Sequence, residues 1–166
     1  MPESHAKVYA SRLVAKGWAW RPRRGFISLT RDDFVLATQL LEPSYVSMHA
    51  ALHLRGLLDQ VPSTIECVTT RYSLRLRDLG IVYRRVKPSL FFGYERVERA
   101  GSYVFVATPE KALLDAVYFG YSLPDCGFAD LETLKRLARV YASQPGPWAR
   151  RVAAWVRLVA RKGGCA

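Results

Sequence analysis

The sequence contains no asparagine and only three glutamines, while arginine outnumbers lysine by 19 to 6. Depletion of heat-labile amide side chains is typical of thermophilic proteins, and high-GC coding produces the same arginine bias. We therefore expect a protein from a thermophile or from a GC-rich genome.

Cysteine is scarce and scattered. Cys67, Cys126 and Cys165 lie far apart in the sequence and are odd in number. Without a C-x-x-C pair the sequence offers no zinc ribbon, and this spacing offers no disulfide framework. A reducing compartment, the cytoplasm, is the expected location.

Long apolar runs and the common catalytic motifs are also missing. No stretch approaches eighteen consecutive apolar residues, and the first five residues lack the apolar run of a signal peptide. There is no G-x-S-x-G, no phosphate-cradling glycine loop and no G-x-G-x-x-G. We therefore expect no membrane partner, no enzymatic activity and no cofactor.

Acidic residues are the scarce charge. The sequence has 14 Asp and Glu and 25 Lys and Arg, which gives a net charge of +11 and a pI near 10. Half of the 166 residues are apolar, which argues against disorder and fits one domain, or one domain with a small appendage. A positive excess of this size predicts a polyanionic partner.

Residues 1–30 carry much of that charge. Ser4 is the predicted cap of a basic helix that ends at Gly17, and a hairpin follows around the turn at residues 21–25. A basic helix beside a basic hairpin looks like the recognition helix and wing of a winged helix, in which the helix fits the major groove. The alternative is a solvated basic surface. The candidate DNA-binding residues are Lys7, Arg12, Lys16, Arg21, Arg23 and Arg24.

Residues 31–166 predict an α+β domain with a mostly antiparallel or mixed sheet of about four strands. Thr108 followed by Pro109 is a strong helix start, because threonine caps the backbone and proline suits the first turn. The predicted helices cover residues 31–42, 48–54, 108–120, 130–142 and 148–161, and the predicted strands cover 64–70, 80–86, 90–97 and 103–107.

Other chemically interesting residues have plainer explanations. His49 and His53 have the spacing of a metal pair, but no third ligand suggests itself, so core or boundary positions are favoured. Glu110, Lys111 and Asp115 are expected to cap a helix and form ion pairs rather than to catalyse. Core packing is likewise favoured over base stacking for the strand aromatics Phe91, Phe92, Tyr94, Tyr103 and Phe105.

Several segments together resemble a known family. Residues 13–17 and 24–29 look like the end of the N-terminal winged helix of AbiEi-type antitoxins. Residues 45–52, 65–70 and 106–115 resemble parts of their second domain. This resemblance implies two domains, residues 1–30 and 31–166, of which the first binds operator DNA and represses its own operon. The second would act as antitoxin against a nucleotidyltransferase-like toxin of a type IV system, and the two proteins need not touch.

The chain departs from the family at its start. A full winged helix has two helices before the recognition helix, whereas about three residues precede it here. Either the true start lies upstream or half of the module is lost. We expect the apolar side chains of this unit to pack on the second domain or on a partner, namely Leu13, Trp18, Trp20 and Phe26.

Two other functions remain open at this point. One is a protein-interaction or antitoxin module without sequence-specific DNA binding, which the missing helices favour. The other is a small RNA-binding protein or a nucleotidyl-chemistry enzyme, for which the sequence has no motif.

Overall fold

The computed structural model describes residues 3–123 and 126–162, which form six α-helices and one six-stranded mixed sheet. The α+β class is therefore confirmed. The helices are α1 (Glu3–Ala15), α2 (Asp33–Leu40), α3 (Met48–Leu54), α4 (Pro109–Phe119), α5 (Leu131–Ala142) and α6 (Pro147–Lys162). The strands are β1 (Ser44–Val46), β2 (Ile65–Thr69), β3 (Leu74–Leu76), β4 (Ile81–Arg85), β5 (Tyr94–Arg99) and β6 (Ser102–Ala107).

Side chains cap three of the helix starts, of which the start at Thr108 was predicted. Asp32 accepts hydrogen bonds from the first amides of α2, Thr108 accepts from Lys111 N at the start of α4, and Asp130 accepts from Thr133 N in α5. The predicted cap at Ser4 is wrong, because α1 already begins at Glu3 and Ser4 lies inside the helix. Gly17 has a φ of 73° and ends the N-terminal helical turn as predicted.

The sheet has six strands rather than about four, in the order β3-β4-β2-β1-β6-β5. The two unpredicted strands, β1 and β3, have three residues each and are too short to show an alternating pattern. β1 pairs antiparallel with β2 and parallel with β6, and β2 pairs parallel with β4. Because β1 joins both halves of the sheet, its omission from the sequence prediction concealed the topology.

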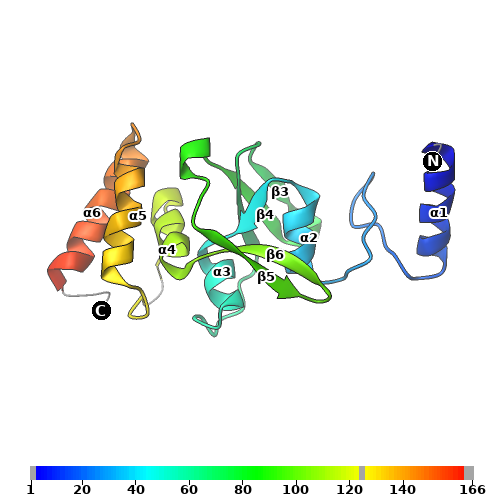
Figure 1. Cartoon of the computed structure of the whole chain (residues 1–166), viewed down its shortest axis with the longest axis horizontal. Helices are drawn as coiled ribbons and strands as arrows, with labels where there is room; N and C mark the ends of the chain where they lie inside the picture. The colour runs from blue at the N-terminus through cyan, green and yellow to red at the C-terminus, as the bar shows by residue number, and fades with distance from the viewer. Residues whose placement is uncertain (1–2, 124–125, 163–166) are drawn as a thin grey trace.

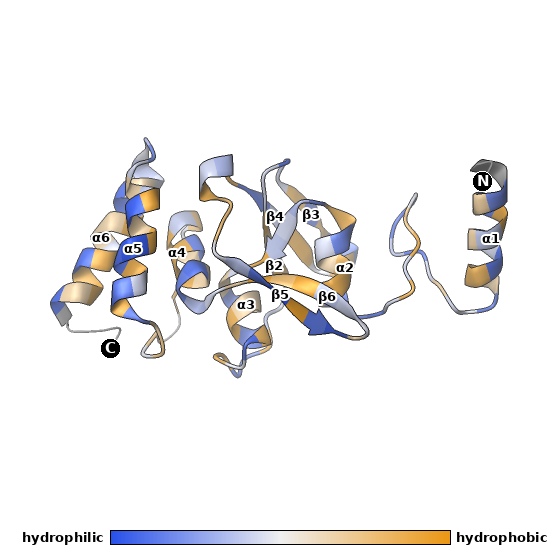
Figure 2. Ribbon diagram, viewed as in Figure 1, coloured by the Kyte–Doolittle hydropathy of each residue, from blue (hydrophilic) through white to orange (hydrophobic). Residues whose placement is uncertain are grey.

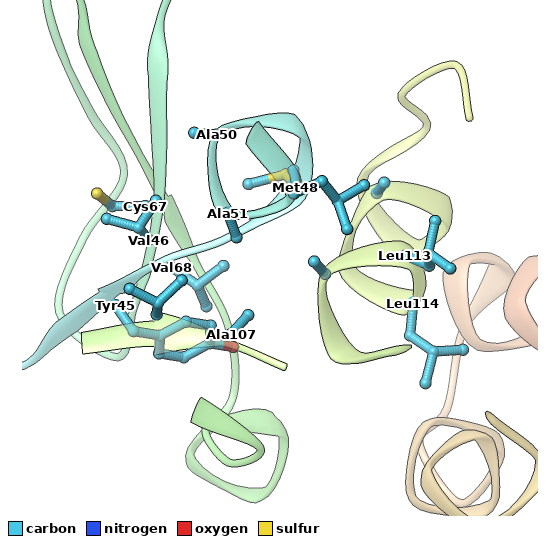
Figure 3. Close-up of a cluster of buried hydrophobic side chains, with 14 of the residues drawn as sticks. Tyr45, Val46, Met48, Ala50, Ala51, Cys67, Val68, Ala107, Leu113 and Leu114 are labelled. Atoms are coloured by element: carbon cyan, nitrogen blue, oxygen red, sulfur yellow. The ribbon is translucent and has the colours of Figure 1, made fainter. Parts of the chain in front are cut away.

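Helices cover both faces of the sheet. Tyr83 on β4 donates to the Ala37 carbonyl of α2 at 2.5 Å, and Tyr45 on β1 donates to Asp115 of α4 at 3.1 Å. The pairing register puts Tyr83 on the face of Val46, opposite that of Tyr45. α2 and α4 therefore lie on opposite faces. Buried residues of β1, β2, α3 and α4 form the core between sheet and helices (Figure 3).

The N-terminal unit (residues 1–30) differs from the predicted winged helix. The expected hairpin is held by a single antiparallel bridge between Trp20 and Ser28 and contains no strand. α1 stands at one end of the long axis and α5 and α6 at the other (Figure 1). Within the part described, no other helix or strand packs extensively against α1. We call residues 31–162, apart from 124 and 125, the body.

Candidate nucleic-acid interface

The basic residues of α1 face solvent. Lys7 and Arg12 are exposed on the helix, and Lys16 is exposed just after its end. From His5 to Lys16 only Ala10, Leu13 and Val14 are half-buried. The helix therefore presents its cations to solvent on a cylinder of the size that enters a major groove.

The turn that follows is compact. Trp20 and Ser28 exchange backbone hydrogen bonds of 2.9 and 3.0 Å, and Phe26 N donates to the Arg23 carbonyl at 3.0 Å. Gly25 has a φ of 86°, which only glycine adopts without strain. Arg21, Arg23 and Arg24 are all exposed on this turn. The chain thus displays three guanidinium groups within four residues.

One side-chain hydrogen bond joins the turn to α1. Arg21 Nη2 donates to Ser11 Oγ at 3.2 Å. Lys7 and Arg21 also line one groove together with Phe26 and Ile27. The structure therefore brings α1 and the arginine turn side by side, as a helix and its wing would be, although the full winged helix is absent from the part described.

Trp20 anchors this unit to the body. Its ring packs against the hydrophobic core of the body, while its Nε1 donates to the Thr30 carbonyl within the unit at 2.7 Å. Leu13 is half-buried, whereas Trp18 is 66 % exposed and Phe26 is 38 % exposed. Of the four apolar residues expected to need a packing surface, only Trp20 finds one on the body.

The positive charge of the unit is left largely uncompensated. Arg12, Lys16, Arg21, Arg23 and Arg24 form no ion pair among the residues that the structure describes. Instead, the Lys16 ammonium lies 5.1 Å from the centre of the Trp18 ring, and the Arg12 guanidinium lies 6.0 Å from that of Tyr9. Cations without carboxylate partners are available to phosphate oxygens.

The residues that follow the turn lie near the body. Residues 27–30 line one pocket together with Gln39 of α2 and residues 100–102 at the β5–β6 turn. The N-terminal unit therefore approaches the body at α2 and the β5–β6 turn.

A second polar constellation lies inside the body. The Asp115 carboxylate accepts from Lys111 Nζ at 2.6 Å, from Ser47 Oγ at 2.7 Å and from Tyr45 Oη at 3.1 Å. Tyr141 Oη also donates to Asp115 and accepts from Lys111. The side chains of Lys111 and Asp115 are both fully buried. The predicted ion pair is confirmed, and its carboxylate has four donors.

This buried pair holds elements together and is closed to substrates. It joins α4 to β1, to the β1–α3 junction and to α5, and the Lys111 ammonium lies 4.9 Å from the ring centres of Phe92 and Tyr141. Burial lowers the pKa of Lys111, whereas Asp115 raises it in part. Burial, followed by the charge of Asp115, raises the pKa of Tyr141. A group without solvent access has no route to substrate, so we assign it a structural role.

The histidines and cysteines add no site. His53 Nδ1 lies 3.0 Å from the Leu58 carbonyl, and the His49 ring lies against that of Tyr121. No cluster of three metal-binding side chains occurs among the described residues. Cys67 is a free buried thiol, whereas Cys126 is disulfide-bonded. The sequence spacing gave no sign of that disulfide, and Cys165 lies outside the described residues.

Four of the five aromatic residues behave as predicted, whereas Tyr103 lies outside the core, against Phe105 and Arg96. Phe91, Phe92, Tyr94 and Phe105 are half-buried and pack against the core. Tyr94 stacks on the buried Tyr45 at 4.7 Å between ring centres. These rings are held by one another and are not free to accept stacked bases, so core packing is confirmed over a base-stacking platform.

Sequence reasoning missed two features. Glu66 on β2 is only 5 % exposed, and its Oε2 has no hydrogen-bond partner. A second set of cations, between residues 71 and 87, was not grouped because it spans two strands and a turn. Its signal was present in the sequence, as six Lys and Arg against one acid, Asp78.

Comparison with known proteins assigns no family. No family model matches the chain, and no curated protein matches it. The helices of the described part include none with the length and apolar character needed to cross a membrane.

Proposed function

We propose that this protein is a DNA-binding regulator and antitoxin of the AbiEi type, which binds duplex DNA through α1 and the arginine turn. In this proposal it works in the cytoplasm, without a cofactor and without enzymatic activity of its own. A disulfide at Cys126 is compatible with that location in hyperthermophiles, whose intracellular proteins are rich in disulfides.

One observation carries the proposal. Six exposed cations lie on α1 and the adjoining turn, and the Arg21–Ser11 hydrogen bond keeps the two segments together. A helix with a basic turn at its side can place the helix in the major groove while the turn contacts phosphates. The net charge of +11 adds attraction to any polyanion, and binding through it weakens with salt as counterions are released.

The test is binding to a duplex taken from the region upstream of the protein's own gene, compared with a shuffled duplex of equal length. We expect tighter binding to the upstream duplex at about physiological salt. Equal affinity for both duplexes over the whole salt range would contradict operator recognition and leave only non-specific attraction.

The arginine turn is tested separately with the double variant Arg23→Ala and Arg24→Ala. Each lost phosphate contact should reduce the slope of log K against log salt by about 0.9. The matched control replaces both residues by lysine, which keeps the charge and should retain most of the slope. An unchanged slope in the alanine variant would show that the turn makes no phosphate contact.

The antitoxin role is the second half of the proposal, and it rests on the resemblance of residues 31–166 to the family's second domain. It is tested by expressing this chain beside a nucleotidyltransferase-like protein encoded next to it. Restored growth without a stable complex is expected. Growth arrest that persists despite expression of this chain would contradict an antitoxin role.

A protein-interaction module is the second candidate, and the exposed apolar residues of the N-terminal unit favour it. Val8, Tyr9 and Trp18 are all at least half exposed, and Leu29 is 74 % exposed. Apolar side chains gathered on one unit mark an interaction surface. A partner that copurifies through residues 1–30, together with no preference for the upstream duplex, would favour this candidate.

A further inference from the structure

The C-terminal helices carry a second concentration of positive charge. From residue 133 to residue 166 the sequence has eight Lys and Arg and no Asp or Glu. In the described part of this segment, Lys135 is the only cation in an ion pair, with Glu132 at 2.7 Å. The positive charge at this end of the molecule is therefore largely uncompensated.

α6 buries one face and exposes another. Its buried residues recur at intervals of three and four positions and so form one stripe along the helix, which consists of Ala149, Val152, Val156 and Val159. Through this buried stripe α6 packs against α4 and α5. Three exposed arginines recur at intervals of seven and four positions, and we call them the arginine stripe: Arg150, Arg157 and Arg161. At about 3.6 residues per turn, the arginine stripe lies roughly opposite the buried stripe.

The arginine stripe has no carboxylate partner in the part of the chain that the structure describes. None of its three guanidinium groups lies within ion-pair distance of an acidic side chain there. Arg157 Nε donates to the Ala153 carbonyl one turn earlier at 3.2 Å. The neighbouring Arg151 differs, because its guanidinium lies 5.0 Å from the centre of the Trp148 ring. The arginine stripe thus offers three cations along about 16 Å of helix to an external anion with several charges.

The arginine stripe faces away from the rest of the molecule. α6 stands at the end of the long axis opposite α1, with α4 between α6 and the sheet (Figure 1). Because the buried stripe of α6 faces α4 and α5, the arginine stripe faces the solvent beyond this end. An anion bound to the arginine stripe therefore lies on the far side of the body from one bound at α1.

The chemistry of this surface favours a nucleic acid over a membrane. A helix that lies on a membrane inserts its apolar face, but that face of α6 is buried inside the protein. Guanidinium groups bind phosphate oxygens through two parallel hydrogen bonds, and a duplex presents about one phosphate charge per 1.7 Å of its axis. A row of three arginines therefore matches a regular polyanion better than it matches the scattered carboxylates of a protein surface.

We infer that the arginine stripe of α6 binds the phosphate backbone of a second segment of duplex DNA, so that one chain bridges two segments. The bridging rests on the proposed function, which supplies the segment held by the N-terminal unit. The contact at α6 depends only on the charges of that helix. It carries no base recognition, because cations that contact phosphates read no sequence.

Bridging is measured with two short duplexes. The upstream duplex carries a fluorescent donor and the shuffled duplex an acceptor, and the wild type should bring them together and produce energy transfer. The variant Arg150→Ala with Arg157→Ala and Arg161→Ala should reduce this transfer about fivefold or more, because it removes three phosphate contacts. The control is Arg71→Ala with Arg77→Ala and Arg85→Ala. It also removes three exposed cations without ion pairs among the described residues, and it should keep most of the transfer.

The outcomes separate this inference from the function on which it rests. No transfer with the wild type, while the upstream duplex still binds, would overturn the inference and leave the proposed function intact. Transfer that survives in the α6 variant, or equal losses in the two triple variants, would also overturn it. If Arg23→Ala with Arg24→Ala leaves binding of the upstream duplex unchanged, the proposed function fails, and the contact at α6 is then decided by chemical modification alone.

Chemical modification of the wild type tests the contact at α6 without any substitution. Phenylglyoxal modifies accessible arginines, and mass spectrometry gives the rate at each position. With shuffled duplex at about ten times its Kd, modification of the arginine stripe should slow about tenfold, because only the free protein reacts. Arg77 should react as fast as in the free protein. Unchanged rates at the arginine stripe would overturn the inference, and slower rates with phosphatidylglycerol vesicles or polyglutamate but not with duplex would overturn DNA as the occupant.

Discussion

The interior of the body holds most of its apolar side chains and one fully buried ion pair, whereas most charged and apolar side chains of the N-terminal unit face outward. Lys111 and Asp115 are fully buried and satisfied by each other, by two tyrosines and by a serine. In the N-terminal unit Arg23 and Arg24 are exposed, and Trp18 is 66 % exposed. Figure 2 shows hydrophobic residues on the packed strands and helices of the body, and both kinds mixed around α1.

This difference indicates that the body supplies the stability of the fold, whereas the N-terminal unit is the part suited to binding. A helix of 13 residues that packs on little else is marginally stable in water. The body buries its own apolar surface and folds around it, while α1 gains most when another molecule covers it. The part of the chain with the fewest internal contacts is thus the part best suited to an external partner.

The largest expected effect comes from breaking the buried pair. Asp115→Asn removes the counter-charge of Lys111 and leaves a buried cation, which should lower the free energy of unfolding by about 3–5 kcal/mol. Urea unfolding followed by circular dichroism measures it. The matched double variant, Lys111→Met with Asp115→Asn, should be less destabilised than Asp115→Asn alone. A loss below 1 kcal/mol would mean that the body depends on this pair no more than on a surface contact.

A smaller effect is expected at Glu66, the buried carboxyl that breaks the pattern of the body. Burial raises its pKa from 4.5 to about 6, partly offset by the backbone amide of Ala50. The folded protein therefore binds more protons than the unfolded chain between these values, so stability falls as pH rises from about 4.5 to 6, by up to about 2 kcal/mol. Glu66→Gln should remove that fall and stabilise the protein at pH 7. The measurement is the free energy of unfolding of the wild type and of Glu66→Gln at each pH from 4 to 7. A constant difference between the two proteins over this range would disprove the shift in pKa.

The smallest effect belongs to the N-terminal unit. Trp18→Ala should change the free energy of unfolding by no more than about 0.5 kcal/mol, because the side chain is mostly exposed. Trp20→Ala is the matched comparison and should cost clearly more, since Trp20 packs on the core and donates to Thr30. Thermal unfolding of both variants without DNA gives the answer. Equal losses of unfolding free energy in the two variants would show that Trp18 is held by the fold as firmly as Trp20 is.

Local signals in the sequence predicted most helices correctly. The cap at Thr108 with Pro109 behind it and the glycine at position 120 each act within one turn of chain. Such features need no knowledge of distant residues. The Lys111–Asp115 pair was predictable for the same reason, because residues four apart face each other on a helix.

Features made by distant residues were beyond the sequence. Tyr45 and Tyr141 meet Asp115 across 70 and 26 residues, and nothing near either tyrosine signals the meeting. The three-residue strands β1 and β3 owe their form to neighbouring strands rather than to a pattern of their own. At the candidate interface the sequence identified the cations, but only the structure joined the arginine turn to α1 through the Arg21–Ser11 hydrogen bond.

Both outer strands of the sheet also have a bearing on how the protein behaves at high concentration. β3 is only three residues long, with Arg75 at its centre, and β5 exposes Glu95, Arg96 and Glu98. Charged or very short margins discourage one sheet from adding strands to another, which is the usual start of fibrous aggregates. A chain with such margins can reach high concentration without polymerising, and replacing the arginines at these margins removes part of that protection.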